Sequence, residues 1–302
     1  MFESNKIIQN SIIVTIAIII SFAVVAIDLP EQSFDSQKPK EISDEIWNSL
    51  KSAVQEAKLL PTPKGIGGED SKFGKSVSVD GDRALVGAPN TVGHGAVYVL
   101  DLIDGLWVES AVLIPIDGEI DDQFGYSVSL KGNRALIGTR FDDDNGVESG
   151  SAYVFDLTAG SWSQTQKLIA TDGMANDNFG VSVSLSADRA LIGARGVDDN
   201  GSASGSAYIF DLTTGLWSQT QKLMASDGAA SDQFGFSVSL SVNRALIGAY
   251  FDDDNGTNSG SAYVFDLTAG SWSQTQKLIA SDSIENDEFG YTVSLSDNRA
   301  LM

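Results

Sequence analysis

The residues best suited to chemistry in this sequence are aspartates gathered in short loops. An Asp-Asp-Asp-Asn-Gly stretch at 142–146 returns at 252–256, and a shorter Asp-Asp-Asn-Gly stretch lies at 198–201. Clustered carboxylate and amide oxygens are the ligands that calcium prefers. The same residue types also favour tight, solvated hairpin turns. The sequence therefore allows two interpretations of these loops: a calcium site or an acidic turn.

As EF-hand-like loops, these stretches match only in part. With the glycine at position six, Asp143 and Asn145 take positions three and five, but Phe141 stands at position one, where a carboxylate is usual. The counterpart of this loop at 88–95 reads Ala-Pro-Asn-Thr-Val-Gly-His-Gly, which contains no acid. The acids are therefore not required for folding, and they serve either a function or only the surface charge.

A second set of aspartates recurs in the loops that follow the last candidate strand of each repeat. In an antiparallel four-stranded unit, these loops and the acidic stretches leave the sheet on the same side, so oxygens from both sets are expected to share one face. Calcium is the candidate ion, and diffuse screening by cations is the alternative. The candidate metal ligands are Asp142, Asp143, Asp144, Asn145, Asp198, Asp199, Asn200, Asp252, Asp253, Asp254 and Asn255, with Asp172, Asp177, Asp227 and Asp232 on the same face.

Composition excludes several classes of function. The net charge of −22 would repel phosphate backbones, so nucleic acid is not an expected partner. The chain has no cysteine and a single histidine, His94, which excludes disulfides, thiolate sites and a histidine cluster. Every acid of interest repeats along the chain, whereas a catalytic pair is usually unique. The sequence therefore predicts a protein that is not an enzyme.

The elements that position these loops belong to an internal repeat. Phe-Gly occurs at 73, 124, 179, 234 and 289, which gives a period of 51 and then 55 residues, and an arginine follows ten residues after each phenylalanine. A tryptophan series at 107, 162, 217 and 272 keeps the same spacing. We expect the tryptophans to pack one unit on the next, and each arginine to pair with an acid or a carbonyl between units. Repetition at this period is typical of solenoids and propellers.

Each unit contains four short candidate strands separated by turn residues, as in 124–168. Four antiparallel strands per unit of this length predict an all-β chain, a β-propeller whose blades stack around an axis. A β-solenoid is the alternative, but solenoids usually repeat over shorter periods. The chain ends inside the fifth unit, so we expect an incomplete propeller, either a fragment or a truncated gene.

Phe73-Gly74 followed by Gly87-Ala88-Pro89 resembles the FG-GAP repeat, the unit of the integrin α-subunit propeller and of many bacterial surface proteins. The resemblance covers roughly 52–302, although later units replace the Gly-Ala-Pro motif. It implies a seven-bladed propeller used for extracellular adhesion or ligand binding, often with calcium, and it does not imply catalysis. In integrin-like repeats the calcium loop links the first two strands of a blade, a link that is too short here, so the family's calcium residues have no counterpart at those positions.

The N-terminus carries a targeting signal. Residues 12–27 form an apolar run after a short polar stretch, which predicts a hydrophobic helix within 1–27 that acts as a cleaved signal peptide or a membrane anchor. Residues 28–51 read as a polar linker with a possible short helix. We therefore expect an extracytoplasmic, secreted or cell-surface module that binds a protein or glycan ligand and touches a membrane only through this segment. The alternative is the propeller part of a larger secreted hydrolase.

Overall fold

The computed structural model describes residues 71–91, 93–296 and 299–302. The hydrophobic helix, the polar linker and the start of the repeats expected within 1–70 lie outside the described residues. The described part contains no helix long and apolar enough to cross a membrane. All elements of that part are β-strands, so the all-β prediction is confirmed.

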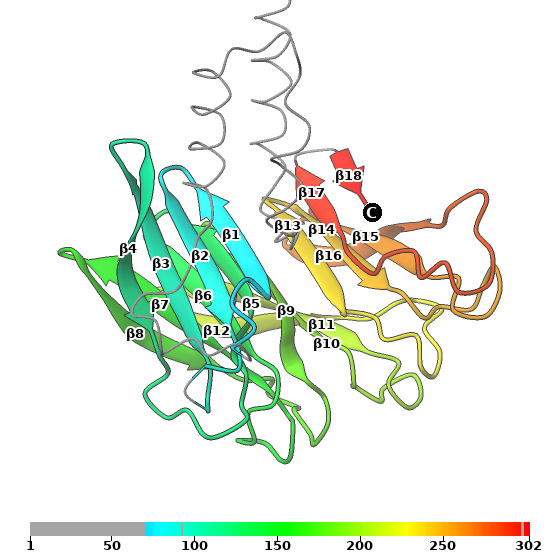
Figure 1. Cartoon of the computed structure of the whole chain (residues 1–302). Coiled ribbons are helices and arrows are strands. Elements are labelled where there is room, and N and C mark those ends of the chain that lie inside the picture. The colour runs from blue at the N-terminus through cyan, green and yellow to red at the C-terminus, as the bar shows by residue number, and fades with distance from the viewer. Residues whose placement is uncertain (1–70, 92, 297–298) are drawn as a thin grey trace, which may run out of the picture. The chain divides into compact units, whose positions relative to one another are not determined.

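Four consecutive four-stranded antiparallel sheets follow the repeat, and we call them blades 1 to 4. In each sheet the strands lie side by side in the order of the sequence (Figure 1). A fifth, two-stranded sheet ends the described chain. The strands are β1 (Ser76–Asp80), β2 (Arg83–Ala88), β3 (Ala96–Ile103) and β4 (Leu106–Leu113) in blade 1; β5 (Phe124–Lys131), β6 (Arg134–Thr139), β7 (Ser151–Thr158) and β8 (Ser161–Leu168) in blade 2; β9 (Phe179–Ser186), β10 (Arg189–Ala194), β11 (Ser206–Thr213) and β12 (Leu216–Leu223) in blade 3; β13 (Ser237–Ser241), β14 (Arg244–Ala249), β15 (Ser261–Thr268) and β16 (Ser271–Leu278) in blade 4; and β17 (Ser294–Ser296) and β18 (Arg299–Leu301).

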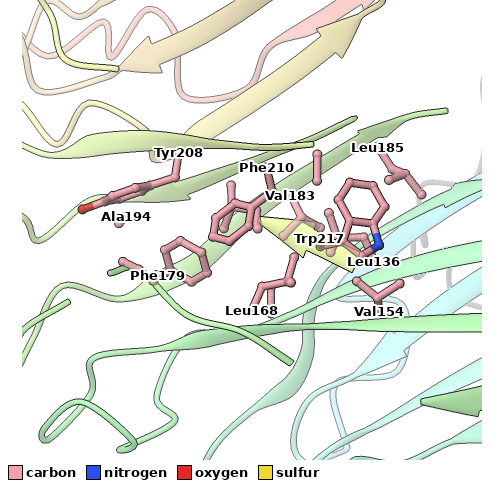
Figure 2. Close-up of a cluster of buried hydrophobic side chains, with 14 of the residues drawn as sticks. Leu136, Val154, Leu168, Phe179, Val183, Leu185, Ala194, Tyr208, Phe210 and Trp217 are labelled. Carbon is pink, nitrogen blue, oxygen red and sulfur yellow. The ribbon is translucent and has the colours of Figure 1, made fainter. Parts of the chain in front are cut away.

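The hydrophobic core lies between blades, because a single sheet cannot cover both of its own faces. One cluster combines Leu136, Val154 and Leu168 of blade 2 with Phe179 and Trp217 of blade 3, all of them buried or nearly so (Figure 2). The same arrangement recurs between blades 3 and 4. Each blade is therefore stabilised chiefly by its neighbours.

Paired glycines explain the Phe-Gly motif and the glycine that recurs near the end of the second strand of each unit, at 87, 138, 193 and 248. A Cβ on Gly138, in the second strand of blade 2, would lie 2.0 Å from the carbonyl oxygen of Gly180, in the first strand of blade 3. Gly180 has a φ of 85°, which disfavours any other residue. Its carbonyl also accepts a 2.8 Å hydrogen bond from the Ser127 hydroxyl of blade 2. The motif thus marks the point where the inner strands of two blades meet backbone to backbone (Figure 1).

The recurring arginine and tryptophan have linked roles. Arg134 Nε donates to Asp156 Oδ1 at 2.6 Å, and these two residues face each other on β6 and β7 of the same blade. The guanidinium also lies over the Trp217 ring of the next blade, 5.4 Å from its centroid. The expected packing of tryptophan between blades is confirmed. The expectation that the arginine pairs with an acid or a carbonyl between blades is confirmed as well: Arg134 Nη1 lies 3.4 Å from Asp188 Oδ1 of blade 3, and Arg189 Nη1 donates to the Val242 carbonyl of blade 4 at 3.3 Å.

Candidate functional site

The two acidic sets meet around a lysine in blade 2. Lys167 Nζ lies 2.8 Å from Asp142 Oδ2 and 2.6 Å from Asp144 Oδ2, both in the loop after β6. It also lies 3.0 Å from Asp117 Oδ2, in the loop that follows β4 of blade 1. The expectation that the loops after the second and fourth strands share one face is therefore confirmed here. Carboxylates from two consecutive blades converge on one ammonium group.

The sheet register brings Lys167 to this position. Lys167 lies near the end of β8, paired with Tyr153 of β7, and the Tyr153 hydroxyl donates to Asp142 Oδ2 at 3.0 Å. The Asp142 side chain is 3% exposed and that of Lys167 is 16% exposed. Burial lowers the pKa of Lys167, but its hydrogen bonds to Asp142 and Asp144 outweigh burial and raise the pKa above its ordinary value. The lysine is therefore held as a cation.

Blade 4 repeats the arrangement. Lys277 Nζ lies 2.9 Å from both Asp227 Oδ2 and Asp252 Oδ2, and it also contacts Asp254. The Tyr263 hydroxyl donates to Asp252 Oδ2 at 2.7 Å. Burial alone would raise the pKa of Asp252, but the hydrogen bonds from Lys277 and Tyr263 lower it below the ordinary value. Asp252 is thus a buried carboxylate kept ionised by its partners.

Blade 3 lacks the buried carboxylate. Val197 stands where blades 2 and 4 have Asp142 and Asp252, and it packs into the core between the blades. Lys222 Nζ keeps two carboxylate partners, Asp172 at 2.7 Å and Asp199. The Tyr208 hydroxyl, buried at the equivalent of Tyr153, has no hydrogen-bond partner within the described chain. The lysine in this blade is therefore less completely surrounded.

Blade 1 lacks both components. Its loop between β2 and β3 contains no acid, and Val112 pairs with Tyr98 at the register position that Lys167 takes opposite Tyr153. The lysine and the acidic loop are thus present together or absent together in the four blades.

Several of the carboxylates predicted as calcium ligands lie around the lysines. Across 71–91, 93–296 and 299–302, no group of three or more acidic or histidine side chains is arranged to hold a metal ion. In blades 2 and 4 the point where three carboxylates converge already holds an ammonium group. The residues present therefore do not fit a calcium ion at that point, and calcium binding stays a prediction.

The rest of the acidic stretch forms a turn. Gly146 has a φ of 121° and donates its backbone N–H to the Asp143 carbonyl at 2.9 Å. Asp143 Oδ1 accepts from the backbone N–H of Glu148 at 2.7 Å, and Glu148 takes the left-handed conformation with a φ of 55°. Asn145 does not take the left-handed conformation, and its side-chain amide donates to the Ala170 carbonyl at 3.3 Å. The corresponding residues Asp198, Asn200, Asp253 and Asn255 make equivalent turn contacts.

The aspartates of the inter-blade loops divide into two groups. Asp117, Asp172 and Asp227 contact the lysines, whereas Asp122, Asp177 and Asp232 are buried and accept a backbone N–H three residues earlier, as in the 2.7 Å bond from Glu119 to Asp122. Burial raises the pKa of Asp122 and of Asp232 to about 6, helped by repulsion from Asp142 and Asp252 respectively. Asp177 and Asp232 thus stabilise a turn and lie outside the lysine cluster, although both were expected among the metal ligands.

Sequence reasoning missed the three lysines. Each lies in an alternating Ser-Gln-Thr-Gln-Lys strand, a pattern that indicates a wet outer face. The signal that would have found them is their distribution, since the only complete unit with an acid-free loop also has valine in place of lysine. In every other blade the charge of the loop predicts a cation within reach.

Comparison with known proteins identifies the repeats. The FG-GAP repeat family matches residues 54–100, 107–155, 162–210, 217–265 and 272–302. Among curated proteins, none matches the chain. The crystal structure of Saccharomyces cerevisiae Sqt1 is similar over 70% of this chain and 49% of that chain, with 10% sequence identity and a TM-score of 0.43. A likeness at that level says nothing about function. The stretches 107–155, 162–210 and 217–265 each run from the fourth strand of one blade to the third strand of the next. Because the five matched stretches make up most of the sequence and follow the period of the blades, the chain belongs to the FG-GAP repeat family.

Proposed function

We propose that this chain is a non-catalytic ligand-binding module that works outside the cytoplasm and recognises a basic protein partner. The contact surface is the loop face, formed by the loops after the second and fourth strands at 114–123, 140–150, 169–178, 195–205, 224–233, 250–260 and 279–288. Of the chain's 41 acidic residues, 21 lie in these loops, whereas the eight described turns at the opposite end of the blades contain three. This charge asymmetry is the observation that carries the proposal.

The lysines leave most of this charge uncompensated. Three carboxylates surround Lys167, and the neighbouring Asp143 carboxylate is exposed and accepts only a backbone hydrogen bond. A surface with excess charge of one sign steers an oppositely charged partner and discourages partners of the same sign. The loop face is therefore suited to a basic partner.

Aromatic side chains lie at the same end of blade 4. The Phe236 and Tyr250 ring centroids are 4.3 Å apart, and Tyr291 stacks near both, 5.0 Å from Phe236, while remaining 50% exposed. An exposed aromatic ring beside carboxylates suits the guanidinium or ammonium groups of a basic protein, since it adds a cation–π contact. Aromatic residues are also enriched at the centres of protein interfaces.

The test compares equal charge removal at the two ends of the blades. Asp143→Asn, Asp198→Asn and Asp253→Asn combined remove three carboxylates from the loop face and keep the oxygen that caps each turn. Asp82→Asn, Asp104→Asn and Asp188→Asn remove three from the opposite turns. Binding of an immobilised lysine- and arginine-containing peptide is expected to weaken by about three- to tenfold in the first variant only. Equal weakening in both variants would indicate general charge attraction and contradict the proposal.

The proposed location rests on the apolar run at 12–27, which is typical of an export signal or a membrane anchor. Fusing the first 40 residues to a reporter enzyme that is active only after export tests it. Reporter activity is expected with the natural segment and none after charged residues are placed in the run. An inactive fusion with the natural segment would contradict the extracytoplasmic assignment.

A further inference from the structure

The lysine clusters have the composition of a metal site with an ammonium at the centre. In blade 2 three carboxylate oxygens from two loops lie within 3.0 Å of Lys167 Nζ, and in blade 4 three lie as close around Lys277 Nζ. Calcium binds carboxylate oxygens at about 2.3–2.6 Å, slightly closer than an ammonium group does. The two kinds of cation would therefore compete for the same oxygens.

We propose that Lys167 in blade 2 and Lys277 in blade 4 are the built-in cations of their blades. Each ammonium occupies the position that a divalent ion would take, and it ties the acidic loop of its own blade to the loop that leaves the preceding blade. The folded repeats consequently do not need calcium. The latent metal site becomes available only when the lysine side chain is removed.

The internal cation has a physical advantage over a bound ion. It is covalently attached, so its occupancy does not depend on ion concentration, whereas a bound metal stabilises the fold only in proportion to its concentration relative to its dissociation constant. The side chain also extends from a strand whose register is fixed by seven residue pairs, from Ala152 with Leu168 to Thr158 with Ser161. The position of the lysine at the loops is therefore set by the register of the sheet.

The differences between blades support this assignment. Blade 1, which lacks the acids, has Val112 and so no uncompensated ammonium beneath its loop. Blade 3 retains Lys222 but has Val197 in place of the buried carboxylate, so two carboxylates remain around the ammonium. Two carboxylates are too few to build a calcium site of ordinary coordination. Blade 3 is thus an internal control within the same molecule.

The experiment uses the full chain and three variants, Lys167→Ala, Lys277→Ala and Lys222→Ala. The melting temperature is measured in EDTA, in millimolar calcium, and in sodium chloride of equal ionic strength, which separates ion binding from simple screening. In EDTA we expect Lys277→Ala and Lys167→Ala to lower the melting temperature by about 5–10 °C, and Lys222→Ala to lower it less. Added calcium should then restore part of the loss in the first two variants, in a saturable way, and should not do so in Lys222→Ala.

The wild-type chain supplies a result that does not depend on any variant folding. Its melting temperature is expected to respond to calcium no more than to the sodium control. A saturable rise in wild-type melting temperature that disappears on chelation would overturn the proposal, because calcium would then bind with the lysines in place. Failure of calcium to restore Lys277→Ala would also overturn it, since the ammonium would not occupy a metal position.

Discussion

Blades 1 and 2 build the same four-stranded sheet with different charges at the loop end. In blade 2 the loop after β6 contains the buried Asp142, and Lys167 of β8 forms an ion pair with it. In blade 1 the corresponding loop has no acid, and Val112 takes the place of the lysine. The sheet register is nevertheless unchanged, as Tyr98 pairs with Val112 and Tyr153 pairs with Lys167. The comparison shows that the acidic loop and the lysine form a removable unit added to a blade that folds without it.

The largest effect is expected from removing the cation in a complete cluster. Lys277→Met keeps the length of the alkyl chain but leaves the Asp252 carboxylate, 2% exposed, without its cation. Breaking a buried ion pair in this way typically costs about 3–5 kcal/mol. We expect a loss near the lower end of that range in the free energy of unfolding, measured by urea denaturation at pH 7.

Blade 1 provides the matched control for that measurement. Val112 occupies the same register position and is 40% exposed. Val112→Met should change the free energy of unfolding by less than about 0.5 kcal/mol, as is usual for an exposed site without special contacts. Equal losses from the two substitutions would show that the strand end tolerates no change and that the charge is irrelevant.

The next largest effect is the coupling between the lysine and its buried partner. Asp252→Asn removes one charge from the cluster while Lys277 keeps Asp227 and Asp254. In the double variant with Lys277→Met neither the buried carboxylate nor the ammonium remains, so the two losses should not add. We expect a coupling energy of about 2 kcal/mol from the double-mutant cycle. Strict additivity would contradict a direct interaction between these two side chains.

The sequence predicts those features of the site that depend on nearby residues, and it does not predict contacts that depend on strand register or on a neighbouring blade. The repeat, its strands and the shared face of the two loop sets can be predicted from residue spacing and turn residues. The shared face is confirmed by Asp117 and Asp142, which come from the two loop sets and contact the same lysine. The lysine contact depends on register between β7 and β8, with a shift between Val154 and Phe155. Such a shift has no signature in an alternating polar strand. The contact between Gly138 and Gly180 likewise joins two blades, and these glycines are 42 residues apart in the sequence. The sequence therefore shows the glycine motif but not the backbone contact that requires it.

A third prediction concerns pH and the loops between blades. Burial raises the pKa of Asp122 to about 6, so between pH 4 and 6 the folded state holds this proton more tightly than the unfolded chain does. Stability from this group is therefore fully present below pH 4 and is lost as the pH rises through 6. Asp122→Asn mimics the protonated acid and should leave stability unchanged at pH 4 but raise it by about 1–2 kcal/mol at pH 7.

The counterpart in the next inter-blade loop sharpens this test. Asp177 is buried in the same kind of turn, and its pKa is also raised by burial, but Val197 replaces the buried carboxylate that repels Asp122. Asp177→Asn should therefore gain less at pH 7 than Asp122→Asn does. Urea denaturation of both variants between pH 4 and 8 measures the difference, and a larger gain for Asp177→Asn would be inconsistent with repulsion from Asp142.

The smallest expected effect comes from completing the cluster of blade 3. Val197→Asp would place a carboxylate beside Lys222 and give an acceptor to the hydroxyls of Ser206 and Tyr208, which are buried without hydrogen-bond partners in the described chain. In blade 4 the equivalent Ser261 and Tyr263 hydroxyls donate to Asp252 at 2.9 and 2.7 Å.

The gain from two satisfied hydroxyls and a charged partner must exceed the lost apolar packing of Val197, which is 4% exposed. A hydrogen bond to a charged group contributes roughly 1.5–3 kcal/mol, and burying a valine side chain contributes roughly 1.5–2 kcal/mol. We therefore expect a net stabilisation of about 1 kcal/mol at pH 7, measured by urea denaturation. The asparagine in Val197→Asn has nearly the same shape as aspartate but no charge, so this variant should be less stable than the wild-type chain. If the asparagine variant were the more stable of the two, a carboxylate at this position would not be stabilised by Lys222.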